Sequence, residues 1–201
     1  MTTPATSARR LPRGYTLTRV LLDHAGIESA LDSIAEAIAE RNPEPGELAL
    51  VGIRRGGVHL ARRIAARLDA ARPGTQVPIG VVDITLYRDD LDRAGANPII
   101  GPTEIPFEID GITVVLVDDV LYTGRTIRAA LDALVDYGRP RGVQLAVLID
   151  RGHRELPIQP DYVGQVLGAS ASDQVEVLLA EEGGDDTAVL LEREVTGGGD
   201  G

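Results

Sequence analysis

Three short stretches of this 201-residue chain are almost wholly apolar, and they constrain its fold more than any other feature. They are residues 48–53, 111–117 and 143–149. A strand with one face in water alternates apolar and polar residues, whereas a strand covered on both faces does not. Apolar residues recur at helical spacing between and before these strands, over residues 26–41, 56–68 and 124–137. This alternation of buried strands and amphipathic helices predicts an α/β fold with a central parallel sheet flanked by helices.

The remaining segments are expected to complete a single domain over residues 21–192. Shorter strands are predicted at residues 77–86, 162–167, 174–179 and 188–191. Residues 87–107 show no periodicity and contain Asp, Asn, Gly and Pro, which predicts a long loop. Loops of that length inside a domain usually serve as lids or binding loops. The two ends, residues 1–20 and 193–201, are expected to be flexible tails.

The residue types that are missing exclude several kinds of chemistry. The chain has no Cys, and all 20 of its Lys+Arg residues are Arg. It therefore has no lysine to bind phosphate in a Walker-A loop or to form a Schiff base, and no thiol nucleophile or Cys-ligated metal. No apolar run approaches the roughly 18 residues of a membrane span, so we expect a cytoplasmic protein that does not enter membranes. An enzyme with this composition has to use carboxylates, arginines, hydroxyls and backbone amides.

The net charge of −11 is unevenly distributed along the chain. Residues 26–47 hold six acids and one Arg, and residues 173–201 hold nine acids and one Arg. Residues 48–172 are nearly neutral, with fifteen acids and fourteen Arg. The acidic total therefore does not argue against a site for an anionic ligand in the middle of the chain.

The residues that follow the strand at 111–117 carry the strongest chemical signal. Two adjacent carboxylates, Asp118 and Asp119, precede the turn Thr123-Gly-Arg-Thr126, which opens a helix. Backbone amides at a helix start bind anions, and the threonine hydroxyls add donors for a phosphate. Two carboxylates suit hydroxyl donors or Mg²⁺ instead. A ligand with a phosphate at one end and vicinal hydroxyls beside it, such as a ribose 5-phosphate, matches both halves of the segment.

Three motifs, which follow one another along the chain, resemble those of a known family. They are Asp83-Ile-Thr-Leu-Tyr-Arg-Asp-Asp90, Val117-Asp-Asp-Val-Leu-Tyr-Thr-Gly-Arg-Thr126 and Asp150-Arg-Gly-His-Arg-Glu-Leu-Pro157. The chain resembles the PyrR family over roughly residues 26–192. That family belongs to the type I phosphoribosyltransferases and joins uracil phosphoribosyltransferase activity to the regulation of pyrimidine-operon messages. The resemblance implies a type I phosphoribosyltransferase fold with a small hood at about 150–192 and a flexible lid at about 87–107.

The resemblance also implies a role for each motif. Its substrates would be phosphoribosyl pyrophosphate (PRPP) and uracil, its products UMP and pyrophosphate, and its cofactor Mg²⁺, bound through PRPP with the help of the acid pair. PRPP would be held by Asp118, Asp119, Leu121, Tyr122, Thr123, Gly124, Arg125 and Thr126. The pyrophosphate would lie on the loop Arg54, Arg55, Gly56 and Gly57, and Arg88 in the lid would act in catalysis with the two acids. Uracil would lie near Asp150, Arg151, Gly152 and His153.

Some residues depart from the pattern of this family and its relatives. Tyr122 stands where some related transferases place a third acid, so that position offers no carboxylate base. Gly56 stands where the family usually has the arginine of its Thr-Arg-Gly loop. The first helix presents Glu28, Asp32, Glu36 and Glu40 where the family has a basic face for RNA. Acids repel nucleic-acid phosphates, so RNA binding, which the family places also at His153 and Arg154, is expected to be weakened here.

Three functions therefore stay open at this point. The first is a Mg²⁺-dependent uracil phosphoribosyltransferase, and the second is mainly an RNA-binding attenuation or translation regulator with residual transferase activity. The third is a purine or orotate transferase, against which the Asp150–Pro157 motif argues. A homo-oligomer, dimer or larger, is expected from the resemblance and from apolar surface near the second strand and the lid.

Overall fold

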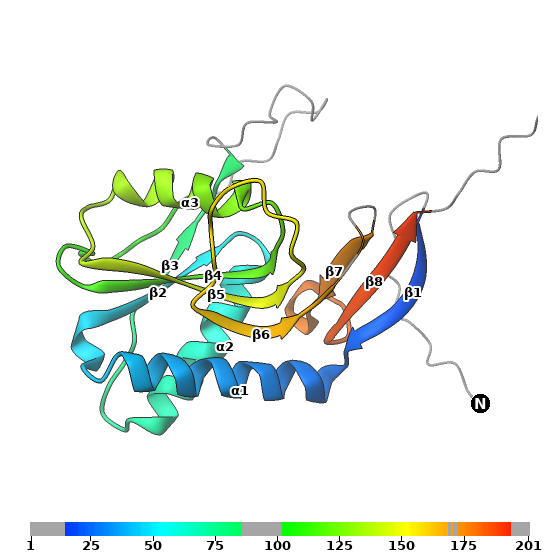
Figure 1. Cartoon of the computed structure of the whole chain (residues 1–201). Coiled ribbons are helices and arrows are strands. Elements are labelled where there is room, and N and C mark those ends of the chain that lie inside the picture. Colours follow the sequence, from blue (N-terminus) through cyan, green and yellow to red (C-terminus); the bar gives the residue numbers. More distant parts are fainter. Residues whose placement is uncertain (1–14, 86–101, 169, 171–172, 194–201) are drawn as a thin grey trace, which may run out of the picture.

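In a computed structural model, the chain forms a five-stranded sheet with helices on both faces and a three-stranded sheet beside it (Figure 1). The structure describes residues 15–85, 102–168, 170 and 173–193. The larger sheet has the order β3-β2-β4-β5-β6, and all neighbouring strands are parallel. Its strands are β2 (Leu48–Ile53), β3 (Ile79–Val82), β4 (Thr113–Leu121), β5 (Gly142–Asp150) and β6 (Tyr162–Val166). The predicted α/β fold with a parallel sheet is confirmed.

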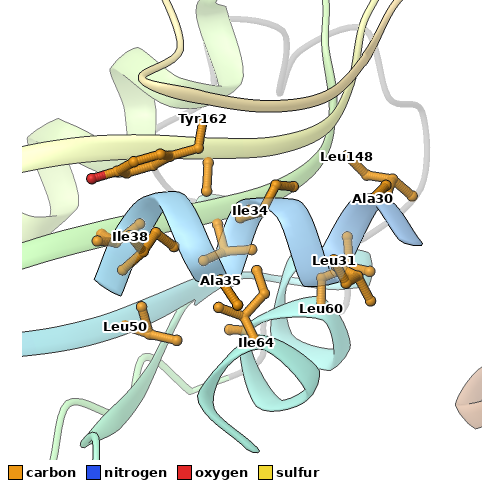
Figure 2. Packing of buried hydrophobic residues seen from close by; sticks show 14 of the residues in the cluster. Ala30, Leu31, Ile34, Ala35, Ile38, Leu50, Leu60, Ile64, Leu148 and Tyr162 are labelled. Carbon is orange, nitrogen blue, oxygen red and sulfur yellow. The ribbon is translucent and has the colours of Figure 1, made fainter. Parts of the chain in front are cut away.

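The helices explain why the central strands are apolar throughout. Helices α1 (His24–Arg41) and α2 (Gly56–Ala71) cover one face of the sheet, and α3 (Arg125–Val135) covers the other. Along β4, Val115 and Val117 belong to the core on the α1 and α2 side, while Val114 and Leu116 belong to the core on the α3 side. Figure 2 shows the first of these cores, where residues of α1 meet α2 and the sheet. Both side-chain sets of each central strand are therefore buried, as period-2 alternation requires.

The smaller sheet has the order β1-β8-β7 and is antiparallel. It consists of β1 (Tyr15–Leu22), β7 (Gln174–Leu178) and β8 (Thr187–Arg193), with the short 3₁₀ helix η4 (Ala180–Glu182) between the last two. A second short 3₁₀ helix, η1 (Pro45–Glu47), leads into β2. We call the three-stranded sheet with its β7–β8 connection the hood.

The structure corrects the predicted boundaries of the tails and the hood. Residues 15–20, expected in a flexible tail, belong to β1, because they pair with β8 from the far end of the chain. Arg193, expected in the other tail, is the last residue of β8. Residues 162–166, expected in the hood, instead extend the parallel sheet as β6 beside β5. Such pairings join distant segments, so local patterns do not reveal them.

The predicted lid lies mostly outside the described residues. Its last part, from Pro102 to Phe107, is described, and Glu104 forms an antiparallel bridge with Val81 of β3. That part is therefore tied to the edge of the sheet through the two hydrogen bonds between Val81 and Glu104, each 2.8 Å long. Among the described residues, no helix has the length and apolar character needed to cross a membrane.

Candidate active site

A cavity of about 470 Å³ lies where the carboxyl ends of β2, β3 and β4 meet the hood. In open parallel sheets this edge is where ligands bind. Predicted site residues contribute six of its lining residues: Arg54, Arg55, Gly56, Asp118, Asp119 and Thr126. The other lining residues come from the end of β3, from β4 and from the hood: Asp83, Ile84, Thr85, Val120, Val175, Glu176, Val177 and Glu182.

The two carboxylates at the end of β4 lie next to each other, Asp118 buried and Asp119 half-buried. Asp118 is 6% exposed, and its Oδ1 accepts the amide of Asp119 at 3.0 Å. Asp119 Oδ1 accepts the amide of Val120 at 2.8 Å. Burial raises the pKa of both carboxyls, and the neighbouring charge of Asp119 raises the pKa of Asp118 further. A ligand that offers hydroxyl groups or a cation to this pair would relieve that cost of burial.

The start of α2 lies directly against the acid pair. A Cβ on Gly56 would lie 2.6 Å from Asp119 Oδ2, and a Cβ on Gly57 would lie 2.2 Å from the carbonyl oxygen of Val117. Only glycine allows the helix start to come this close to β4. Asp119 can therefore occupy its position only because residue 56 is glycine, where the family usually has arginine. A longer side chain at residue 56 would displace that carboxylate.

Arg54 extends the same wall of the cavity toward β3. Its Nε lies 3.6 Å from Asp83 Oδ2, and one of its guanidinium N–H groups donates to the carbonyl oxygen of Pro102 at 2.9 Å. Asp83 is itself 7% exposed, and its amide donates to Thr103 Oγ1 at 3.0 Å. Arg54 is therefore held at the rim between β2 and the last part of the predicted lid, with part of its charge balanced by Asp83.

The turn between β4 and α3 leads into a helix start, as the sequence predicted. Gly124 precedes α3 with φ of 91°, in the left-handed region that favours glycine. The amide of Arg125 donates to Thr123 Oγ1 at a long 3.3 Å, and Thr126 lines the cavity. The guanidinium of Arg125 turns outward to Glu155, at 2.7 Å. The predicted phosphate cradle thus rests on backbone amides and Thr126, whereas Leu121 is buried in the core.

The Asp150–Pro157 motif covers this turn from outside. The amides of Glu155 and Leu156 donate to the carbonyl oxygen of Thr123, at 3.0 and 3.1 Å, and Gly124 lies beneath Leu156 and Ile158. The Asp150–Pro157 motif and the phosphate turn, which are separated by about thirty positions in the sequence, therefore pack against each other.

Two arginines of that motif point inward. The guanidinium of Arg151, 6% exposed, lies 3.7 Å from the ring centre of Tyr122, and His153 meets the same ring edge-on at 6.4 Å. Arg154 pairs with Asp150 at 2.7 Å and donates to the carbonyl oxygen of Tyr122 at 3.0 Å. Arg154, expected as an RNA contact, therefore holds the motif together through these two interactions.

The acidic face of α1 is partly neutralised by α2. Arg67 donates to both Glu28 and Asp32 at 2.6 Å, and Arg63 lies 3.5 Å from Glu28. The sequence showed this face only as acidic where the family has a basic one, since helix spacing does not show which neighbour a charged residue meets. This half of the acidic stripe binds the two helices to each other.

The structure also reveals site residues that the sequence did not suggest. Glu176 of β7 and Glu182 of η4 line the cavity from the hood, together with the acid pair at the end of β4. Their positions depend on how the hood is placed, and no local motif marks them. Arg88, predicted to act in catalysis, lies outside the described residues, as do residues 86–90 of its motif.

The donor set fits an ion held together with a ligand and does not form a cage of its own. Within the described ranges, no cluster of three or more His, Cys, Asp or Glu side chains could hold a metal. Asp118 and Asp119 supply carboxylate oxygens at the cavity wall, which is the ligand type that Mg²⁺ prefers. A Mg²⁺ ion that arrives with a phosphorylated ligand therefore suits these residues.

Comparison with solved structures places the fold. A hypoxanthine-guanine phosphoribosyltransferase from Bacillus anthracis superposes with a TM-score of 0.65 at 15% identity, covering 88% of this chain and 99% of that one. A hypoxanthine phosphoribosyltransferase from Staphylococcus aureus gives 0.60 at 22% identity, covering 79% and 81%. The predicted type I phosphoribosyltransferase fold is thereby confirmed, while identities this low say nothing of the substrate.

Sequence relatives are much closer. A family model described as "Phosphoribosyl transferase domain" matches residues 21–177. Proteins named "Bifunctional protein PyrR" are 55% identical in Pelotomaculum thermopropionicum, over 86% of this chain and 94% of that one, and 54% identical in Thermus thermophilus, over 87% and 96%. Together with the cavity at the end of β4, these matches show that the chain belongs to the PyrR family of type I phosphoribosyltransferases.

Proposed function

We propose that the protein is a uracil phosphoribosyltransferase that converts uracil and PRPP to UMP and pyrophosphate. The observation that carries the proposal is the pair Asp118 and Asp119 beside a glycine-opened helix start, in a cavity that Arg54 also lines. PRPP requires carboxylates that accept hydrogen bonds from its hydroxyls, amides that donate to one phosphate and a guanidinium that donates to a second phosphate group. Membership of the PyrR family supports uracil as the acceptor.

Each wall of the cavity has its own part in this reaction. The carboxylates of Asp118 and Asp119 accept hydrogen bonds from the ribose hydroxyls and fix the sugar ring. The amides at the start of α3 and the hydroxyl of Thr126 hold the 5-phosphate. The pyrophosphate lies at the start of α2, where Gly56 lets the backbone approach, with Arg54 beside it. The leaving group gains negative charge as its bond to C1′ breaks, and these donors stabilise that charge.

The sugar carbon gains positive charge as the pyrophosphate leaves, and the acidic wall favours that state. Carboxylates that face the cavity stabilise a cationic sugar more than a neutral one. Tyr122 offers no carboxylate to deprotonate uracil, and its ring instead stacks under Arg151. Mg²⁺, held by the acid pair together with PRPP, would neutralise charge on the pyrophosphate when it is bound.

Formation of UMP from uracil and PRPP tests the proposal directly. The double variant Asp118→Asn with Asp119→Asn should lose UMP formation while keeping the fold, since the amides preserve the shape of the side chains. Retained activity in the folded double variant would contradict the assignment of the ribose site. An assay with uracil, hypoxanthine and orotate in competition identifies the base, and preference for another base would contradict the acceptor.

A second candidate function, RNA-dependent regulation, follows from the family. The charges of α1 disfavour it here, because Glu28 and Asp32 occupy the Arg67 guanidinium and Glu36 and Glu40 add negative charge to the same helix. Arg154 is engaged with Asp150. A gel-shift titration with the leader RNA of the chain's own pyrimidine operon should give only nonspecific affinity, about 10⁻⁴ to 10⁻⁶ M. Sub-micromolar binding that depends on uridine nucleotides would favour the regulator.

Homo-oligomerisation stays a prediction. Sedimentation velocity over a range of protein concentrations would test it, and a monomer at every concentration would contradict it.

A further inference from the structure

One guanidinium, that of Arg63, fastens the β7–β8 connection to α2. Its Nε and one terminal nitrogen donate to the two oxygens of Glu181, at 2.9 and 2.6 Å. The terminal nitrogens also donate to the two oxygens of Asp186, both at 2.8 Å. The Arg63 side chain is 15% exposed and Asp186 is 6% exposed. A buried arginine that binds two carboxylates with paired hydrogen bonds forms a strong and directional contact.

Asp186 holds the connection from the inside. Besides Arg63 it accepts the amide of Ala180 at 2.9 Å, which closes the segment from 180 to 186 into a loop. His24 at the start of α1 lies 3.0 Å from the same carboxylate. The contact with Arg63 lowers the pKa of Asp186 to about 2 and also lowers the pKa of Glu181. Both acids are therefore bound in their charged form.

The residue between these two contacts faces the cavity. Glu182 directly follows Glu181 and lines the cavity together with Asp118 and Asp119. His59, one helical turn before Arg63 on α2, lies 4.0 Å from Glu182. Figure 1 shows the connection between β7 and β8 beside α2, the helix that begins at Gly56 in the cavity wall. One face of α2 thus carries both the hood connection and, at its first turn, the loop proposed for pyrophosphate.

We propose that Arg63 is a positioning residue of the transferase reaction, which holds Glu182 in the wall of the cavity that the acid pair of β4 also lines. This inference rests on the proposed function. Glu182 adds a further negative charge to the cavity, where the sugar carbon becomes positive in the transition state. Its charge stabilises that state more than bound PRPP, which repels it, so its loss affects kcat more than the KM for PRPP.

The chain offers a matched control for the test. Arg67 lies one helical turn after Arg63 and is also mostly buried, but it pairs with α1 and not with the hood. The variants are Arg63→Met, Arg67→Met, Glu182→Gln and the double variant Arg63→Met with Glu182→Gln. The hood should stay folded without Arg63, because Leu179, Ala188 and Leu190 join the main core. Glu181→Gln, which weakens only one of the two contacts of Arg63, provides a milder variant.

We expect Glu182→Gln and Arg63→Met each to lower kcat about tenfold and to change the KM for PRPP by less than about threefold. Because Arg63 acts through Glu182, the double variant should lose no more than about tenfold, whereas independent effects would multiply to about a hundredfold. Arg67→Met should keep the wild-type kcat. A multiplicative double variant, or equal kinetic losses in Arg63→Met and Arg67→Met, would overturn the inference.

Hydrogen exchange separates this inference from the proposed function. Peptides covering residues 179–187 should exchange hydrogen faster in Arg63→Met than in the wild type, and at the wild-type rate in Arg67→Met. This result does not depend on which reaction the protein catalyses. A wild-type protein that makes no UMP would refute the proposed function. Slow exchange in Arg63→Met would refute the role of Arg63 by itself, and so would wild-type kcat in that variant when the wild type is active.

Discussion

The contact between α2 and β4 allows a quantitative prediction. It is made by backbone atoms on both sides, so a side chain that changes its rotamer cannot relieve a clash there. Gly57, the second residue of α2, is buried, and a Cβ there would lie 2.2 Å from the carbonyl oxygen of Val117 and 3.1 Å from the Cα of Asp118. A carbon and a carbonyl oxygen approach to about 3.3 Å at the closest. The variant Gly57→Ala therefore requires the start of α2 to retreat from β4 by about 1 Å.

That retreat should cost both stability and activity. Overpacking of a core contact destabilises by about 1–3 kcal/mol, and the better helix propensity of alanine returns less than about 1 kcal/mol of it. A net loss of about 1–2 kcal/mol lowers the Tm of a domain of this size by about 3–8 °C. The same shift displaces the proposed pyrophosphate amides from the acid pair, and a misplacement of about 1 Å costs about a hundredfold in rate.

Thermal unfolding followed by circular dichroism and UMP formation at saturating uracil measure the two effects. Gly142→Ala is the control, since a Cβ at Gly142, the first residue of β5, has no atom within 4 Å. It should keep the wild-type Tm and kcat/KM. If Gly57→Ala also kept both values, the close approach of α2 to β4 would not be required, and the explanation of the site given above would be refuted.

Four further predictions follow from the site and its surroundings. Gly56→Ala should keep the wild-type Tm within about 2 °C but weaken PRPP binding measured by calorimetry, because its Cβ would displace only the Asp119 carboxylate, 2.6 Å away; a lowered Tm with unchanged binding would contradict this. Asp118→Asn should be more stable than the wild type in urea at pH 7, and the difference should shrink toward pH 4. The reason is that burial raises the pKa of Asp118 in the folded state, so the folded wild type holds the proton more tightly than the unfolded chain does. The wild type therefore loses stability as the pH rises from about 4 to about 7. For Asp186 the sign is opposite, since Arg63 lowers its pKa from 3.8 to about 2. Asp186→Asn should therefore be less stable than the wild type at pH 7, and the difference should disappear as the pH falls from about 4 to about 2. A stability difference that does not change with pH, in either variant, would refute the direction of the pKa shift given for that residue. Removal of divalent cations with EDTA should abolish UMP formation and added Mg²⁺ should restore it, whereas full activity in EDTA would exclude the proposed cofactor.

The comparison between sequence and structure is most instructive at the ends of strands. The apolar run before Asp118 predicted both the strand and its burial on two faces, because a chain that crosses the middle of a parallel sheet has no solvent side. The glycine and the two threonines from Thr123 to Thr126 predicted a helix start, and that is where α3 begins. These features depend on neighbours within a few residues, so the sequence contains them directly.

The hood could not be read in the same way. Its first strand, β1, and its central strand, β8, lie about 170 positions apart, and the residues of β1 were expected to be a flexible tail. Strand pairing of this kind depends on packing against distant neighbours and leaves little local signal. For the same reason Glu176 and Glu182 were missed as residues of the cavity.

The sequence by itself determined the α/β fold, the acid pair with its phosphate turn, and the family to which both belong, since these depend on periodicity and on motifs read within single segments. Only the tertiary structure decided which charges meet. It joined Arg67 to the acids of α1, turned Arg154 toward Asp150, and brought Glu182 into the same cavity as the acid pair. A salt bridge needs its two groups within about 4 Å, and in a folded chain that distance is set by the packing of helices and sheets rather than by position along the sequence.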